Sequence, residues 1–136
     1  MYRRILLMLF WIQVLPHHIE FVRDAKNLDV RTQGALIAHN ETYGEEGTNV
    51  NFAEVGEARE IQVRTFERGV ENETLSCGTG VTAAALAAFS MGKVTNSKIE
   101  VHTLGGDLTV SFNPSGKGFS DIVLTGPTEL VFSGML

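Results

Sequence analysis

The chain has 136 residues, of which 43% are hydrophobic and 20% are charged, and this composition excludes an intrinsically disordered protein. Its length fits one small domain. Eleven basic and sixteen acidic residues give a formal charge of −5, which argues against a nucleic-acid-binding protein, because such proteins carry a basic face. The single cysteine excludes an internal disulfide and a cysteine-rich zinc site, so we expect no metal centre.

Residues 1–15 imitate a secretory signal peptide. Arg3 and Arg4 precede an apolar run that only Gln13 interrupts. The run is shorter than the ~20 apolar residues that a bilayer-spanning helix needs. A small-residue cleavage motif is absent before Pro16. We therefore treat residues 1–15 as an aberrant N-terminal segment, and we expect a cytoplasmic protein without membrane association.

The first elements are a short strand and a short helix. Alternating residues over 19–23 predict the strand. Asp29 is suited to cap an amphipathic helix that ends by residues 39–40. An acidic, glycine-bearing loop follows over residues 41–47. The side chains expected to face inward from the helix are Val30, Ala35, Leu36 and Ile37.

Most of the remaining predicted elements are strands. Period-two alternation over residues 48–55 and 60–67, with a polar turn between them, predicts a hairpin. Residues 68–76 read as a polar loop. Four further strands, separated by turns rich in glycine and proline, are predicted over residues 98–104, 107–112, 121–124 and 129–132.

A helix is predicted between the hairpin and these later strands. Residues 81–91 contain five alanines and a leucine, which are strong helix formers, and Gly92 is well placed to end the helix. The stretch contains no charged residue, so we expect it to be buried nearly all round. The predicted fold is α+β, with an antiparallel β-sheet curled around one central buried helix.

The start of this helix carries the candidate chemistry. The first turn of a helix has unpaired N–H groups and a partial positive charge, and glycines at positions 78 and 80 let a ligand approach the backbone. Cys77 lies just before these groups, where the helix favours a thiolate. A thiolate beside an anion site suits proton abstraction from a substrate that bears a carboxylate. The alternative is a glycine-rich turn with a buried, inert cysteine.

Polar residues before this turn add candidates. The Glu67 carboxylate can accept a proton from the thiol, and the Arg68 guanidinium can hold a carboxylate with two hydrogen bonds. Asn49 and Asn51 interrupt a strand that asparagine disfavours, which suggests a binding role. The alternatives are an ordinary solvated Glu–Arg ion pair and an asparagine that marks a turn or bulge.

The ordered combination of these motifs resembles the C-terminal half of diaminopimelate epimerases. The resemblance extends from about residue 16 to the C-terminus. Cys-Gly-Thr-Gly alone would also fit proline racemases, but the residues before it would not. The matching motifs are Asn-Val-Asn-Phe at 49–52, Glu-Arg-Gly at 67–69, Glu-Thr-x-x-Cys-Gly-Thr-Gly at 73–80, Gly-Gly-Asp-Leu at 105–108 and Leu-Thr-Gly-Pro at 124–127.

The resemblance implies an isomerase that interconverts LL- and meso-diaminopimelate for lysine biosynthesis without pyridoxal phosphate or another cofactor. In the family, two cysteines face opposite sides of the substrate α-carbon, one removing a proton and the other returning one. Cys77 matches the second cysteine, and Glu67 matches the carboxylate that tunes it. The resemblance further implies substrate contacts from Asn49, Glu67 and Arg68, and from the backbone N–H groups of Gly78 and Thr79.

The sequence departs from the family before residue 16. The resemblance does not include the family's first domain, which holds the first cysteine, and we interpret the sequence as lacking it. His17 matches the histidine that serves that first cysteine. Residues 11–15 read Trp-Ile-Gln-Val-Leu, whereas the family has a motif such as Leu-Asp-Thr-Gly-Ser. One DNA sequence encodes both in adjacent reading frames, so we interpret residues 1–15 as an out-of-frame reading of epimerase DNA.

Three interpretations follow. The first is an epimerase C-terminal domain that binds diaminopimelate and is inactive alone. The second is another isomerase of the same architecture, such as a proline racemase; phenazine-biosynthesis isomerases lack the cysteine. The third is a non-catalytic carboxylate-binding domain. In the family, the two domains bury facing surfaces against each other around the substrate. We also expect a homodimer, because without the first domain that surface and the apolar residues 5–11 would be exposed to solvent.

Overall fold

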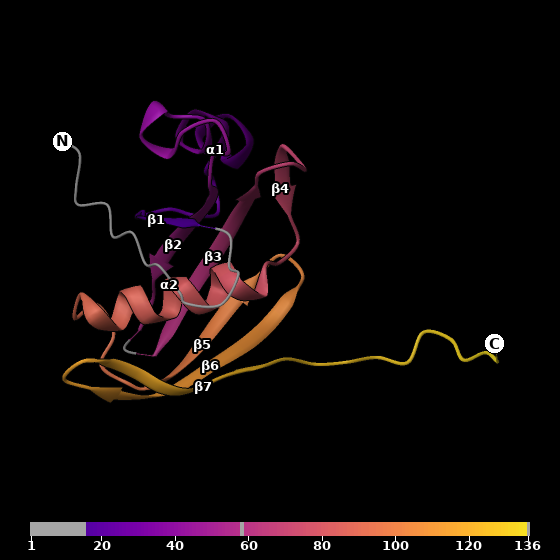
Figure 1. Ribbon diagram of the computed structural model, residues 1–136. Coiled ribbons are helices and arrows are strands. Elements are labelled where there is room, and N and C mark those ends of the chain that lie inside the picture. The colour runs from indigo at the N-terminus through magenta and orange to yellow at the C-terminus, as the bar shows by residue number, and fades with distance from the viewer. Residues whose placement is uncertain (1–15, 58, 136) are drawn as a thin grey trace.

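The computed structural model describes residues 16–57 and 59–135 (Figure 1). The predictions for residues 1–15 fall outside the described residues. The chain forms one curved seven-stranded sheet with two α-helices, α1 (Val30–Ala38) and α2 (Gly78–Ser90), and a short 3₁₀ turn, η1 (Glu41–Tyr43). No helix in this described part is long and apolar enough to cross a membrane.

The sheet is mixed, which corrects the predicted antiparallel sheet. Its order is β1-β2-β3-β5-β6-β7, and β4 pairs with the C-terminal end of β3. The pairs β1–β2 and β3–β5 are parallel and the others are antiparallel. Each parallel pair is joined by a crossover that contains a helix, as parallel pairing requires. The strands are β1 (His17–Phe21), β2 (Asn49–Val55), β3 (Glu60–Glu67), β4 (Asn72–Thr74), β5 (Lys98–Thr103), β6 (Gly106–Ser115) and β7 (Gly118–Thr125).

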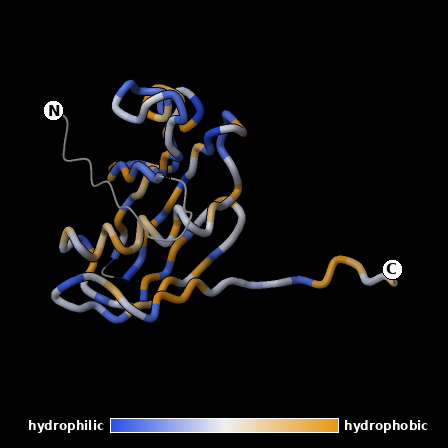
Figure 2. The backbone as a smooth tube through the Cα atoms, viewed as in Figure 1, coloured by the Kyte–Doolittle hydropathy of each residue, from blue (hydrophilic) through white to orange (hydrophobic). Residues whose placement is uncertain are grey.

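Apart from shifted bounds, as where β6 runs through the predicted turn at 113–115, two predictions differ from the observed strands. Strand β4 lies inside the predicted polar loop 68–76. The predicted strand 129–132 is wrong, because this part of the chain has no strand. Leu130, Val131 and Phe132 are 84–85% exposed, on a segment that extends away from the body of the molecule (Figures 1 and 2). Without a strand beside them, apolar residues alone do not form a ladder.

Helix α1 begins where the sequence predicts. The Asp29 carboxylate accepts a hydrogen bond of 3.1 Å from the N–H of Thr32, which caps the helix. Of the side chains predicted to face inward, Val30 is buried and Ala35 and Ile37 are partly buried against the same cluster, so the prediction is wrong only for Leu36. Leu36 is 66% exposed. The buried positions are spaced four residues apart and are Val30, Gly34 and Ala38.

The packing of α1 on the sheet explains why Gly34 lies at the centre of its buried face. A Cβ atom at Gly34 would lie 2.3 Å from the Cβ of Phe66, so the glycine lets the β3 side chain approach the helix. Phe66 is fully buried there, in a small cluster with Val50 and Phe52 of β2. Period-two alternation places these side chains on one face of the sheet. The position of Gly34, and not the apolar residues alone, therefore determines which side of α1 faces inward.

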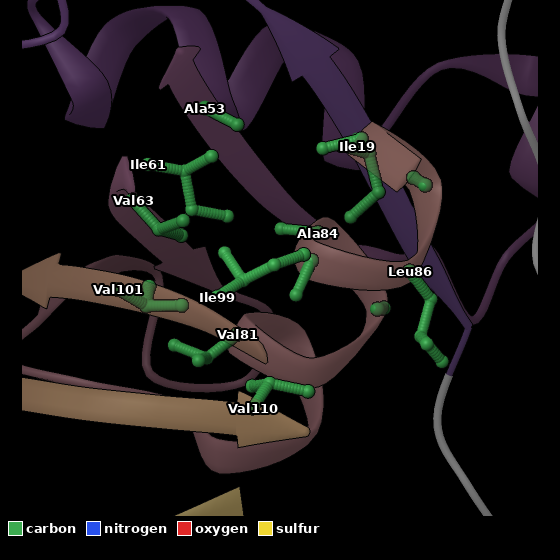
Figure 3. Packing of buried hydrophobic residues seen from close by; sticks show 14 of the residues in the cluster. Ile19, Ala53, Ile61, Val63, Val81, Ala84, Leu86, Ile99, Val101 and Val110 are labelled. Carbon is green, nitrogen blue, oxygen red and sulfur yellow. The ribbon is translucent and has the colours of Figure 1, made fainter. Parts of the chain in front are cut away.

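Helix α2 covers the opposite face of the sheet. Cys77 is its N-cap residue and Met91 its C-cap residue, as predicted. Eight of its residues are buried, five of them alanines. They pack against Ile19, Ile61, Val63, Ile99, Val101 and Val110 of the strands (Figure 3). Because α1 also packs on the sheet, the fold is a curved mixed sheet with two helices, not a sheet around one helix.

An ion pair on the α1 face should contribute strongly to stability. Arg64 of β3 donates to both carboxylate oxygens of Glu73, at 2.6 and 2.7 Å, and to the carbonyls of Ala25 and Leu28, at 2.7 and 2.9 Å. Both charged side chains are largely buried. We expect Arg64→Ala to lower the free energy of unfolding by about 2–4 kcal/mol in urea titrations, because it leaves a carboxylate and carbonyls without partners.

The exposed pair Arg59–Glu100, with a separation of 4.0 Å, provides the matched control. Arg59→Ala should change the unfolding free energy by no more than about 0.5 kcal/mol. Equal effects of the two substitutions would show that the Arg64 pair is not a stabilising contact.

Candidate active site at the start of helix α2

The candidate site is built around the first turn of α2. Cys77 has an extended backbone, is half-buried, and makes no side-chain capping hydrogen bond. The first bond within the helix runs from the N–H of Val81 to the carbonyl of Cys77, at 2.8 Å. The N–H groups of residues 78–80 therefore precede the helical ladder and are available to an anion. The predicted site residues Gly78 and Thr79 supply two of these groups.

Close packing against β2 fixes the position of this turn. Asn51 is fully buried, and a Cβ atom at Gly80 would lie 2.1 Å from the Asn51 side-chain oxygen. Only glycine allows α2 to approach the strand so closely. The Asn51 side chain thus makes its contacts within the protein, so its presence in a strand does not require a bound ligand.

His17, the first residue of β1, contacts the same turn. Its Nε2 lies 3.0 Å from the Oγ1 of Thr79, and that oxygen lies 3.5 Å from the sulfur of Cys77. Its Nδ1 lies 3.1 Å from the side-chain nitrogen of Asn51. The structure therefore brings His17 to Thr79 and Cys77, which lie far from it in the sequence.

Burial keeps His17 neutral. The side chain is almost inaccessible to solvent, and this desolvation lowers the pKa of His17 from 6.5 to about 4. At neutral pH the ring carries one proton, so it donates a hydrogen bond through one nitrogen and accepts through the other. His17 is therefore a hydrogen-bonding group and not a fixed positive charge beside the thiol.

The low pKa of His17 predicts loss of stability in mild acid. Between pH 6.5 and 4 the unfolded chain binds a proton at this residue that the folded chain does not bind. The free energy of unfolding should therefore fall as the pH falls through this window, by about 3 kcal/mol in total. Urea titrations at several pH values measure it. His17→Asn should flatten the dependence, and an unchanged slope in that variant would contradict the assignment.

Asn49 begins β2, Glu67 ends the neighbouring antiparallel strand β3, and Arg68 follows it. Asn49 is buried, and its Oδ1 accepts a 3.0 Å hydrogen bond from the N–H of Arg68. The Arg68 guanidinium donates to the carbonyl of Glu46 and does not pair with Glu67 in the described structure. No hydrogen bond among the described residues joins the Glu67 carboxylate to Cys77. The Glu67–Arg68 dipeptide is therefore not an ion pair.

The sequence reasoning missed Thr65. Its hydroxyl donates a 2.8 Å hydrogen bond to the side-chain oxygen of Asn51, which it faces across the β2–β3 ladder. The predicted hairpin of residues 48–55 and 60–67 already places positions 51 and 65 opposite each other. Two polar side chains that face each other in this way predict a hydrogen bond between the strands.

Known proteins resemble this chain in sequence and in fold. A family model described as diaminopimelate epimerase matches residues 12–131. The diaminopimelate epimerase of Flavobacterium psychrophilum is 45% identical over 117 residues, covering 86% of this chain and 46% of the relative. The diaminopimelate epimerase of Chlorobaculum tepidum is 46% identical over 122 residues, covering 89% and 46%. The chain thus spans less than half the length of these relatives.

Solved structures show the same fold at low sequence identity. A predicted epimerase from Pseudomonas aeruginosa superimposes with a TM-score of 0.54 at 18% identity, over 79% of this chain and 36% of that one. A phenazine-biosynthesis protein of the PhzC/PhzF type from Clostridium difficile gives 0.54 at 20%, over 71% and 34%. The fold is shared with these proteins. Because the family model matches most of the residues, the chain belongs to the diaminopimelate epimerase family of amino-acid epimerases.

Proposed function

We propose that this chain is the C-terminal half of a diaminopimelate epimerase and supplies one of its two proton-transferring thiols. The observation that carries the proposal is the position of Cys77 as N-cap of α2, beside the unpaired N–H groups of residues 78–80. The Cys77 thiolate takes the α-proton and becomes a thiol, and the C–H electron pair moves into the carboxylate. The N–H groups bind the oxygens where that negative charge develops. A thiol on the opposite face returns a proton.

We assign substrate binding to the start of β2 and the adjacent end of β3. The Asn49 oxygen is occupied by the N–H of Arg68, whereas its amide nitrogen has no hydrogen-bond partner among the described residues. That nitrogen is the free donor for a substrate carboxylate. Arg68 supplies a cation on the same rim, and Glu67 an anion that suits an ammonium group and that tunes Cys77.

We propose that the second thiol comes from a complementary half. In the proposed enzyme His17 acts on the Cys77 side of the site through its contact with Thr79, instead of serving the second thiol as the family resemblance implies, and the chain alone has no turnover. The reaction would belong to lysine biosynthesis in the cytoplasm. Neither a cofactor nor a metal ion takes part in the proposed proton transfers, which need only two thiols and a site for the carboxylate.

Complementation in trans tests this function. The experiment mixes this chain with the part of the Flavobacterium psychrophilum relative that the chain does not match. Gel filtration verifies that the two associate. We expect conversion of LL- to meso-diaminopimelate by the complex and by neither part alone. Cys77→Ala is the matched control. Binding of diaminopimelate by a complex that shows no exchange would favour the non-catalytic carboxylate-binding domain, and exchange with proline instead would favour a proline-racemase-like enzyme.

We also propose that the isolated chain forms a homodimer. Val123 and Leu124 of β7, and Leu130, Val131 and Phe132 beyond it, are exposed large apolar side chains. Pairing of two copies would cover such surface with a self-complementary contact. Light scattering at tens of micromolar should give twice the chain mass of 14.9 kDa, and a monodisperse monomer would contradict the proposal.

A further inference from the structure

We infer that Thr65, Asn51, His17 and Thr79 form a one-way chain of hydrogen bonds that ends with the Thr79 hydroxyl donating to the Cys77 sulfur. In this chain Asn51 and Thr65 are positioning residues for the thiol, although neither touches it. The catalytic meaning of the inference rests on the proposed role of Cys77. The hydrogen-bond directions rest on the geometry alone.

The direction is fixed first at Asn51. Its side-chain nitrogen lies 3.4 Å from the backbone carbonyl of His18, and a carbonyl can only accept. Its oxygen lies 2.8 Å from the Thr65 hydroxyl, which donates. The NH₂ end of the amide must therefore face β1, and the Thr65 hydroxyl holds the oxygen end in place. Asn51 and Thr65 are both buried, so water does not compete for these bonds.

The amide then determines the tautomer of His17. The Asn51 NH₂ group also faces the Nδ1 of His17, at 3.1 Å. Two N–H groups cannot face each other at this distance, so Nδ1 accepts and carries no proton. A neutral imidazole then has its proton on Nε2. That N–H points at the Oγ1 of Thr79, 3.0 Å away, and donates to it.

The tautomer in turn directs the Thr79 hydroxyl. One lone pair of its oxygen receives the His17 N–H, so the hydroxyl proton is free to donate elsewhere. The Cys77 sulfur, at 3.5 Å, is its side-chain partner among the described residues. A hydroxyl that donates to sulfur stabilises the thiolate more than the thiol, because hydrogen bonds to charged groups are stronger. The opposite tautomer of His17 would draw the Thr79 proton toward its own Nε2 and away from the sulfur.

Two measurements on the full chain test the inference without any assay of epimerisation. The first is the tautomer of His17, read from two-dimensional ¹⁵N–¹H spectra of the imidazoles and assigned with His17→Asn. We expect the Nε2–H form in the wild type at pH 7. Thr65→Val, which keeps the shape and removes the hydroxyl, should introduce the Nδ1–H form, and Thr65→Ser should restore the wild-type spectrum. A wild-type spectrum with the proton on Nδ1 would overturn the inference.

The second measurement is the alkylation rate of Cys77 with iodoacetamide, which reports on this residue specifically because it is the only cysteine. We expect Thr79→Val to slow alkylation at pH 7 by about 3- to 10-fold and to move the midpoint of the rate–pH curve upward. Thr79→Ser should stay within about twofold of the wild type. A Thr79→Val protein that reacts as fast as the wild type would overturn the inference. Absence of α-proton exchange in the complementation assay would instead refute the proposed function and leave these hydrogen bonds standing.

Discussion

Replacing Cys77 with serine should reduce α-proton exchange in the complemented enzyme by at least about 10³-fold. A serine hydroxyl does not ionise at neutral pH, so the base on one face of the α-carbon is lost. The N–H groups of residues 78–80 belong to the backbone and stay in place. Binding of diaminopimelate should therefore persist. Solvent-deuterium incorporation measures the exchange, and isothermal titration measures the binding.

The two readouts separate a catalytic role from a structural one. Loss of exchange together with loss of binding would show that Cys77 only maintains the turn. Undiminished exchange in Cys77→Ser would show that another group is the base.

The second large effect is expected at Gly80. A Cβ atom there would lie 2.1 Å from the buried Asn51 oxygen, so either α2 or β2 must move. We expect Gly80→Ala to lower the free energy of unfolding by about 3–5 kcal/mol, which outweighs the ~1 kcal/mol that alanine gains within a helix. Urea titration with circular dichroism measures the change. Because Asn51 would be displaced, Cys77 alkylation should also slow.

Gly116→Ala is the matched control for this substitution. No atom lies within 4 Å of a Cβ at Gly116, so the control should change the unfolding free energy by no more than about 0.5 kcal/mol. A Gly80→Ala protein as stable as this control would mean that α2 and β2 are not held in close contact.

Local chemistry explains which parts of the fold could be predicted. The Asp29 cap and the limits of α2 follow from hydrogen bonds and propensities within a few residues, and both predictions are confirmed. The parallel pairings β1–β2 and β3–β5 depend on where the chain returns to the sheet after each helix. The alternation of apolar and polar residues within a strand carries no information about that return. The apolar residues at 129–132 resemble a strand in sequence, yet the described chain offers them no pairing partner.

In the candidate site too, local features could be predicted from the sequence, and contacts between distant residues could not. The position of Cys77 beside free N–H groups could be derived from the Cys-Gly-Thr-Gly sequence and the helix that follows. The contact of His17 with Thr79 could not, because 62 residues and a strand crossover separate them. Asn51 illustrates the difference most clearly. Its polar side chain in a strand suggested a ligand, whereas the structure gives it Thr65 and His17 as partners.

The distribution of deuterium between substrate and product tests most directly whether Cys77 is one of two thiols that face each other across the α-carbon. LL-diaminopimelate is incubated with the complemented enzyme in deuterium oxide and sampled at low conversion. Two opposed thiols predict that the meso product carries one deuteron at the epimerised carbon, while the recovered LL substrate stays unlabelled, because the thiol that removed the proton did not return a deuteron. Recovered substrate that gains deuterium as fast as product forms would contradict the two-thiol site.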